Sequence, residues 1–271
     1  MLKLAAKHVA KPWGRRDVDG FIPGVPAMDE AIGEIWFEAP FEVPLLIKFL
    51  FTSEPLSIQV HPDDAAARRL GLPHGKDEAW IVLDAEPAAT IAIGFETAPS
   101  KEELRRAAQD GSLAQLIDWR PVTAGDVFYS PGGTVHALGA GLKLVEVQQN
   151  LDLTFRLYDF DRPRELQVDE AVAVAEPQLR PAPSSARQLG AGRELIAAGP
   201  AFCVERWSGP SVVACTDGVR RPIWLVPVAG EAEAAGEVMR FGEAWLLDEA
   251  ARVELDAGAS ILVAYVGPDP N

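Results

Sequence analysis

Short apolar runs broken by turn residues dominate this chain, and they restrict its fold more than any other feature. The 271 residues include 23 Gly and 22 Pro, many of which stand between runs rich in Val, Ile, Leu and Phe. Runs bounded in this way are typical of β-strands. Before residue 178 we expect strands at Ile35–Glu38, Leu45–Phe51, Leu56–Val60, Ala79–Leu83, Thr90–Gly94, Asp126–Ser130, Lys143–Gln148 and Phe155–Tyr158.

Helical signals are few. Asp63 can cap a short helix that ends at Gly71. Ser100–Glu103 has the pattern of a capping box, which predicts a helical segment near 100–118. A third short helix is expected at Asp169–Ala175, just before a proline. The chain is therefore expected to be all-β with a small helical insertion.

A proline-rich stretch divides the chain. Residues 176–193 contain three prolines and few apolar residues, so we expect a linker over 179–193. Strands then resume at Ala201–Trp207, Ser211–Cys215, Ile223–Val228, Ala244–Leu247, Arg252–Leu255 and Ser260–Val266. The pattern predicts a jelly-roll barrel over residues 1–178 and a second, smaller β domain over 194–271.

The charge balance excludes some partners. Forty Asp and Glu against 25 Lys and Arg give a net charge of −15, which argues against nucleic acid and against an anionic membrane surface. No apolar run is long enough to span a bilayer. The only cysteines, Cys203 and Cys215, are expected to be buried thiols, which favours a reducing cytoplasm. We expect a monomer or a homodimer.

The segment before His61 places polar residues on one side of a strand. Residues two apart on a strand share a face, so Ser57, Gln59 and His61 point together while Ile58 and Val60 point into the opposite layer. Such a polar row either lines a site or faces solvent. This strand alone leaves both interpretations open.

His136 follows a tight turn. Residues 125–136 have the pattern G-x5-P-x-G-x2-H, which resembles the second motif of the cupin family, although Ala140 stands where that motif usually has Asn. The turn brings the histidine to the inward face of a barrel, where its imidazole can bind a metal. The alternative is a core histidine whose nitrogens bond to the backbone.

Glu78 is a candidate anionic ligand. It opens a strand 17 residues after His61, which is enough chain for a helix and a return beside the first strand. Glu78 and Trp80 share one face of that strand, and Asp77 lies on the other, so Asp77 is the weaker candidate.

Several motifs in order resemble class I mannose-6-phosphate isomerases of the shorter bacterial type. The resemblance covers most of residues 11–175 and implies a cupin fold. It rests on KPWG (11–14), GEIWFE (33–38), LLIKFL (45–50), IQVHPDD (58–64), GKDEAW (75–80), GTVHALGAGL (133–142) and VEVQQNLDLTFRLYDFDR (145–162). It further implies one zinc ion per chain, held by Gln59, His61, Glu78 and His136.

The same resemblance implies an interconversion of mannose 6-phosphate and fructose 6-phosphate through an enediol(ate). Glu146 is a candidate proton-transfer base, and Asp152 and Arg156 match residues that line the sugar site. Arg156 would stabilise the enediolate, because a guanidinium is too basic to accept a proton. Lys76 is assigned to the catalytic group. Because Leu151 stands where the family often has Ser, the substrate range can differ.

Binding of the phosphate is assigned to Ser57, Lys48 and Arg162, with Lys76 nearby. Lys48 sits between apolar residues in a strand, where a lysine is costly unless it faces a wet pocket. Two other functions fit the same ligand types. One is another metal cupin such as an Fe(II) oxygenase, and the other is a sugar-phosphate-binding cupin without catalytic activity.

Overall fold

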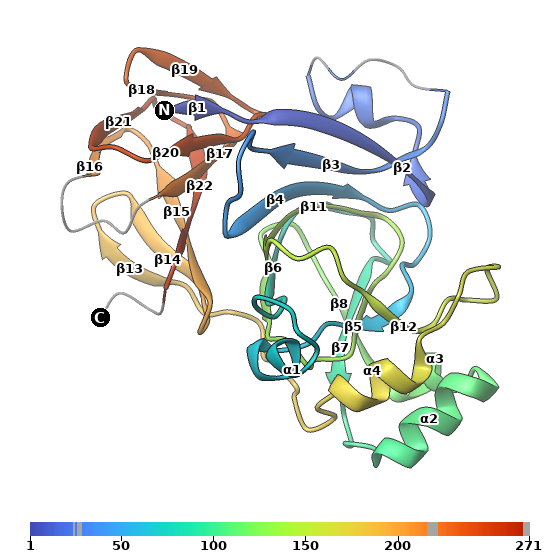
Figure 1. Ribbon diagram of the computed structural model, residues 1–271. Coiled ribbons are helices and arrows are strands. Elements are labelled where there is room, and N and C mark those ends of the chain that lie inside the picture. Colours follow the sequence, from blue (N-terminus) through green and yellow to red (C-terminus); the bar gives the residue numbers. More distant parts are fainter. Residues whose placement is uncertain (24, 26–28, 216–221, 268–271) are drawn as a thin grey trace. The chain divides into compact units, whose positions relative to one another are not determined.

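The computed structural model describes residues 1–23, 25, 29–215 and 222–267 (Figure 1). Antiparallel strands are the main secondary structure of these residues and helices are few and short, which confirms the all-β class. The chain divides into two compact units. The central unit comprises Pro12–Gly14 and Leu50–Pro183, and the terminal unit comprises Met1–Lys11, Arg15–Phe49 and Ser184–Asn271.

This division differs from the expected boundary at residue 178. Most of the first 49 residues group with the C-terminal part of the chain, and within that unit β1 (Leu2–Lys3) pairs with β20 (Trp245–Leu247). The expected linker also contains a strand, since β13 (Arg187–Gly190) forms a hairpin with β14 (Arg193–Ala198). Composition did not reveal either pairing, because β1 is only two residues long and β13 is largely exposed.

The central unit contains two groups of paired strands. One is a five-stranded sheet in the order β12-β5-β10-β7-β8, and the other contains β11, β6 and β9 as neighbours. The five strands are β5 (Ile58–Val60), β7 (Thr90–Phe95), β8 (Ile117–Pro121), β10 (His136–Leu138) and β12 (Phe155–Tyr158). The other three are β6 (Glu78–Ala85), β9 (Val127–Ser130) and β11 (Leu142–Gln149).

The helices of the central unit begin where the sequence predicts. Asp63 caps α1 (Asp64–Arg69) by accepting a hydrogen bond from the Ala66 N–H at 2.6 Å. Ser100 and Glu103 form the expected capping box at the start of α2 (Lys101–Asp110), and α3 (Leu113–Leu116) follows it. The third expected helix is α4 (Val168–Val174). Figure 1 shows α2, α3 and α4 together beside the five-stranded sheet.

One hydrophobic core of the central unit lies between that sheet and those helices. Ile58 and Val60 are fully buried there against apolar residues of α2 and α4, among them Leu104 and Val172. The side chains along β5 therefore alternate as predicted. Ile58 and Val60 face this core, and Gln59 projects from the opposite side of the sheet.

The terminal unit is also built from strands. Its sheets are β1-β20-β17-β22-β15-β14-β13 and β16-β21-β18-β19, and apolar residues of both share one core that includes Trp207 and Met239. Near the N-terminus β2 (Ala5–Arg15) pairs with β3 (Ile32–Glu38), with the 3-10 helix η1 (Val18–Gly20) between them and β4 (Leu45–Phe51) after them. The other strands are β15 (Phe202–Ser208), β16 (Ser211–Cys215), β17 (Ile223–Ala229), β18 (Glu231–Ala234), β19 (Glu237–Arg240), β21 (Ala251–Leu255) and β22 (Ser260–Val266).

Cys203 and Cys215 are both buried as thiols in the terminal unit, as expected. Among the helices that the structure describes, none combines the length and the apolar character that crossing a membrane would require.

Candidate metal centre

Three strands of the central unit bring His61, Glu78 and His136 together. His61 follows the end of β5, Glu78 is the first residue of β6, and His136 is the first residue of β10. The His61 Nε2 atom lies 3.2 Å from Glu78 Oε1, and the His136 Nε2 atom lies 3.4 Å from Glu78 Oε2. One ligand atom from each of the three residues lies within 4.8 Å of the others, and all three side chains are buried. The sequence predicted this group.

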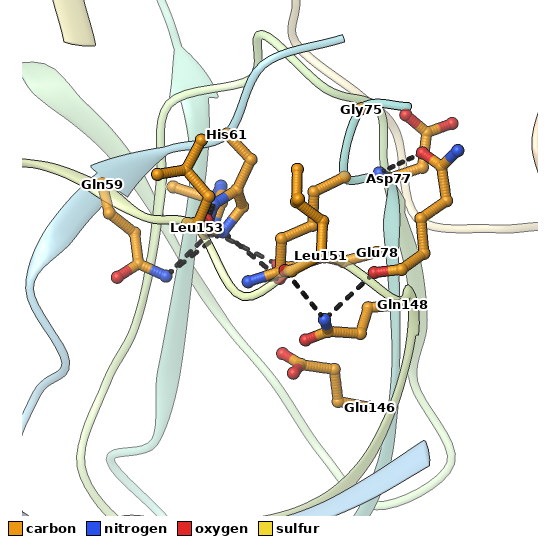
Figure 2. Close-up of polar contacts among 12 residues, drawn as sticks. Gln59, His61, Gly75, Asp77, Glu78, Glu146, Gln148, Leu151 and Leu153 are labelled. Atoms are coloured by element: carbon orange, nitrogen blue, oxygen red, sulfur yellow. Dashed lines mark hydrogen bonds and ion pairs between the residues drawn. The ribbon is translucent and has the colours of Figure 1, made fainter. Parts of the chain in front are cut away.

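Backbone carbonyls orient both imidazoles. His61 Nδ1–H donates to the Leu153 carbonyl at 2.8 Å (Figure 2), and His136 Nδ1–H donates to the Thr134 carbonyl at 2.9 Å. Because a carbonyl oxygen only accepts, the proton of each neutral ring lies on Nδ1. Both Nε2 lone pairs therefore point toward Glu78. A hydrogen bond to the second ring nitrogen is the usual support for a histidine that binds a metal.

The protonation states of His61, His136 and Glu78 agree with imidazole lone pairs that face a carboxylate. Burial, followed by repulsion from Lys76, lowers the pKa of His61 to about 3, and burial also lowers the pKa of His136. Burial alone would raise the pKa of Glu78, but the neighbouring His61 and Lys76 hold it well below its ordinary range. The Lys76 ammonium lies 3.2 Å from Glu78 Oε1. At neutral pH the group consists of two uncharged imidazoles and a carboxylate.

These residues fit a bound cation. Two nitrogen lone pairs and a carboxylate converge, so that three hydrogen-bond acceptors face one another at 3.2–3.4 Å. Acceptors repel at such distances unless a positive charge lies between them. Two imidazole nitrogens and one carboxylate oxygen are ligand types that Zn²⁺ binds, and Fe(II) sites use the same set. The donor chemistry therefore supports a metal site.

Gln59 lies at the edge of this group. Its Nε2 atom lies 3.5 Å from His61 Nε2 and 3.4 Å from His136 Nε2, while its Oε1 atom accepts a hydrogen bond from the Ser57 hydroxyl at 3.0 Å. The nitrogen and oxygen of a side-chain amide occupy nearly the same shape, and half a turn about the last bond exchanges them. That rotation would place Oε1 beside the imidazoles, so the assignment of Gln59 as a ligand stays a prediction.

Glu146 is buried beside this group. It lies opposite Trp80 in the pairing of β11 with β6, two residues before Gln148, which lies opposite Glu78. Residues two apart on β11 share a face, so Glu146 and Gln148 project to the same side (Figure 2). The Trp80 indole N–H donates to Glu146 Oε2 at 3.1 Å.

Arg156 projects from the same sheet face as Gln59, because the two residues are direct partners in the pairing of β12 with β5. Its Nε atom is buried and has no hydrogen-bond partner within the part of the chain that the structure describes. Asp152 is exposed in the loop between β11 and β12, and its negative charge acts on Arg156. Arg156 thus lies beside Gln59, and the sugar-site role of Arg156 and Asp152 stays a prediction.

The residues assigned to phosphate binding, Ser57, Arg162 and Lys48, lie in different parts of the fold. Ser57 is buried on the strand face of Gln59. Arg162 donates to the Pro55 carbonyl and to Asp159 at 2.7 and 2.8 Å, so its guanidinium already has partners. Lys48 belongs to the terminal unit, where its ammonium lies 4.7 Å from the centre of the Trp36 ring. The phosphate role of all three residues stays a prediction.

The chain is similar to known proteins in sequence and in fold. No family model matches the chain. A mannose-6-phosphate isomerase of Streptococcus mutans is 38% identical over 202 residues, which are 70% of this chain and 63% of that protein. Mannose-6-phosphate isomerase ManA of Bacillus subtilis is 41% identical over 140 residues, 49% of this chain and 44% of that protein. The chain thus spans less than two thirds of the length of these relatives.

The structural comparison covers nearly the whole chain. The crystal structure of mannose 6-phosphate isomerase from Bacillus subtilis matches 97% of this chain and 99% of its own, with a TM-score of 0.82 and 24% identity. The fold is that of the phosphomannose isomerases. The resemblance that the motifs indicate is confirmed by the sequence relatives. A further match, with a TM-score of 0.75, 16% identity and 98% and 99% coverage, is a mannose 6-phosphate isomerase described as zinc-bound.

Several supporting groups escaped the sequence reasoning. The Leu153 carbonyl has no side-chain signature, and Gln149, which bonds to Asp77 and Asp64, carries no motif of its own. Two glycines did offer a signal. A Cβ on Gly75 or Gly132 would lie 2.5 or 2.6 Å from backbone atoms of Asp63, so both positions require glycine.

Proposed function

We propose that this protein is a mannose-6-phosphate isomerase that uses one zinc ion per chain to interconvert mannose 6-phosphate and fructose 6-phosphate. The observation that carries the proposal is the buried convergence of His61, Glu78 and His136, with both Nε2 lone pairs directed at the carboxylate. The names of the sequence relatives supply the substrate.

The ligands would be His61, Glu78 and His136, with Gln59 as the fourth after rotation of its amide. When bound, zinc would supply a positive charge that stabilises the negative charge developing on the substrate oxygens at C1 and C2. An aldose–ketose isomerase needs this help because an enediolate carries its charge on those two oxygens.

The polar face of β5 is the proposed position of the substrate. Gln59 lies beside the ligands, and the Ser57 hydroxyl, two residues back on the same face, donates to Gln59 Oε1 at 3.0 Å. An open-chain hexose would lie with its carbonyl end near the metal ligands and its phosphate toward Ser57. A ligand in this position would pass Arg156, the partner of Gln59 on β12, whose buried Nε–H is available as a donor.

Glu146 is the proposed proton-transfer base. It is buried on the side of β11 that carries Gln148, and the Trp80 indole N–H holds one of its oxygens. Moving a proton between C1 and C2 requires one group that first accepts and then returns it. Arg156 cannot accept a proton, and its role is to donate a hydrogen bond to the charged intermediate. Asp152 would orient Arg156, and Lys76 would keep Glu78 ionised.

Arg162 is the basic residue that supports a phosphate site near Ser57. It reaches the Pro55 carbonyl, two residues from Ser57. Arg162 and Arg164 share the carboxylate of Asp159, and Arg162 also lies 3.6 Å from the exposed Glu54, so two carboxylates balance the two guanidinium groups. A dianionic phosphate would therefore have to replace Glu54 as a partner of Arg162. We propose a cytoplasmic location, in keeping with two buried thiols.

The experiment that tests this function is a coupled assay for fructose 6-phosphate formed from mannose 6-phosphate. The purified protein is stripped with a chelator, assayed, reloaded with zinc and assayed again. We expect turnover that disappears on stripping and returns with zinc. If zinc-loaded protein has no turnover, the proposal is wrong. Consumption of dioxygen by the Fe(II)-loaded protein would instead favour an oxygenase, and sugar-phosphate binding without turnover would favour a binding protein.

A further inference from the structure

Asp77 is a buried carboxylate that lies on the face of its strand opposite to Glu78. It is 6% exposed, and it forms no ion pair with any residue that the structure describes. Its Oδ2 atom accepts a hydrogen bond from the Tyr129 hydroxyl at 2.7 Å, and its Oδ1 atom accepts one from the Gly132 N–H at 2.8 Å. Two neutral donors therefore hold this carboxylate.

The backbone of Asp77 also forms hydrogen bonds, both of them with Gln149. Its N–H donates to the Gln149 side-chain oxygen at 2.8 Å, and its carbonyl accepts from the Gln149 N–H at 3.0 Å. Gln149 also donates through its side chain to Asp64 at 3.2 Å. Asp77 thus joins the start of β6 to the turn that contains Gly132 and to the end of β11.

Each of the three segments that Asp77 joins either carries a proposed metal ligand or orients one. Glu78 is the next residue along β6. The turn with Gly132 leads to His136, and its Thr134 carbonyl holds the Nδ1–H of that histidine. The segment after Gln149 supplies the Leu153 carbonyl, which holds the Nδ1–H of His61. A displacement at Asp77 would therefore act on all three ligands.

The same turn also touches the chain that follows His61. The Gly133 N–H donates to the His61 carbonyl at 2.7 Å. A Cβ on Gly132 would lie 2.6 Å from both the Asp63 Cα and the Pro62 carbonyl oxygen. Since the turn packs this closely on Pro62 and Asp63, the bond from Gly132 to Asp77 braces His61 from a second direction.

We propose that Asp77 is a positioning residue that holds the segments bearing Glu78, His136 and His61 at the separation that metal binding requires, and so sets the metal affinity. The inference rests on the proposed function only through the metal centre. It does not depend on which reaction the centre catalyses.

The variant Asp77→Asn separates the effect of the two hydrogen bonds from the effect of the charge. The asparagine carbonyl oxygen can accept from the Gly132 N–H, and its NH₂ can donate to the Tyr129 oxygen, so both links survive without the charge. Alanine removes both links and leaves the buried Gly132 N–H without its partner. The matched control is Asp126→Ala, because Asp126 makes the same two kinds of bond, to the Thr123 N–H at 2.8 Å and the Thr123 hydroxyl at 3.3 Å.

The test measures zinc affinity by competition with a chromophoric chelator, together with the visible absorption of the Co²⁺-loaded protein. Asp77→Ala is expected to weaken zinc binding by roughly 10- to 100-fold, the usual effect of losing a group that orients metal ligands, and to alter the Co²⁺ spectrum. Asp77→Asn is expected to bind zinc nearly as well as the wild type. Asp126→Ala should leave both readings unchanged.

Three results would overturn the proposal. They are wild-type zinc affinity in Asp77→Ala, a loss in Asp77→Asn equal to that in Asp77→Ala, and no zinc binding by the wild type. If Asp77→Ala does not fold, Tyr129→Phe removes one of the two side-chain links, and unchanged affinity in that variant would equally overturn it. A wild type that binds zinc tightly but does not isomerise the sugar phosphate would refute the proposed function alone.

Discussion

Arg156 lies directly across from Gln59 in the antiparallel pairing of β12 with β5. On the other side of β5, His136 is the partner of Gln59 in β10. Partners in neighbouring strands project to the same face, so a guanidinium, an amide and an imidazole form a row across the sheet. The row places Arg156 one strand away from Gln59 and two strands away from His136, which would suit stabilisation of charge close to the proposed metal.

Arg156→Lys should lower kcat by about 10²- to 10³-fold, as expected for loss of one preorganised donor to a developing oxyanion. Lysine keeps the charge but has no donor at the position of the buried Nε. The coupled assay gives kcat, and metal analysis should show unchanged zinc content. The matched control is Arg105→Lys, because Arg105 forms an exposed ion pair with Asp169 in the same unit. If both variants retain full kcat, Arg156 has no catalytic role.

Glu78→Gln should weaken zinc binding by at least about 100-fold, because it removes the only anionic ligand of the triad. Excess zinc should raise the Tm of the wild type, since a ligand at 100 times its Kd stabilises the folded state by about 2.7 kcal/mol. The variant should lose most of this increase. Thermal unfolding with and without zinc measures it, with the exposed Glu38→Gln as control. Equal increases in wild type and variant would contradict the ligand assignment.

Gly132→Ala should destabilise the protein by about 1–3 kcal/mol, because the added methyl group would overlap the backbone of Pro62 and Asp63. The overlap should also shift His61, so zinc affinity should fall with stability. Urea unfolding and zinc titration measure the two effects. Gly20→Ala is the control, because nothing lies within 4 Å of a Cβ at that position. A Gly132 variant as stable as the wild type would show that the turn can relax.

Asp159→Asn should destabilise the protein by about 3 kcal/mol at pH 7, because it leaves Arg162 and Arg164 without their shared carboxylate. Burial acts to raise the pKa of Asp159, but the two guanidinium groups outweigh it and lower the pKa. The stabilisation is thus present above the unfolded-state pKa of about 3.9 and is lost as the pH falls through the lower folded-state pKa.

The difference between wild type and Asp159→Asn should accordingly shrink below about pH 4. Urea unfolding at a series of pH values measures it, and Asp161→Asn serves as an exposed control on the same loop. A difference that stays constant down to pH 2 would mean that the charge of Asp159 contributes nothing.

Local patterns were sufficient to predict much of the site. The alternation from Ser57 to His61 predicted which side chains of β5 enter the core, and the turn before His136 predicted an inward imidazole. These signals are local because a strand alternates its faces with a period of two. Asp63 and Ser100 likewise predicted their helices, since a cap bonds within its own first turn.

Other features depend on groups far apart in the chain. The Leu153 carbonyl lies 92 residues from the His61 ring that it orients, and Gly132 lies 55 residues from Asp77. The pairing of β1 with β20 joins opposite ends of the chain.

The amino-acid sequence by itself determined the strand class, the capped helices and the residue types of a metal centre, because each depends on spacing within a few residues. Only the tertiary structure decided which nitrogen of each imidazole faces Glu78, and which groups brace the centre. A backbone carbonyl carries no residue type, and its partner is set by how distant strands pack. Asp77 shows the difference most clearly: strand alternation made it a weaker ligand candidate than Glu78, and the fold placed it between the segments that carry the proposed ligands.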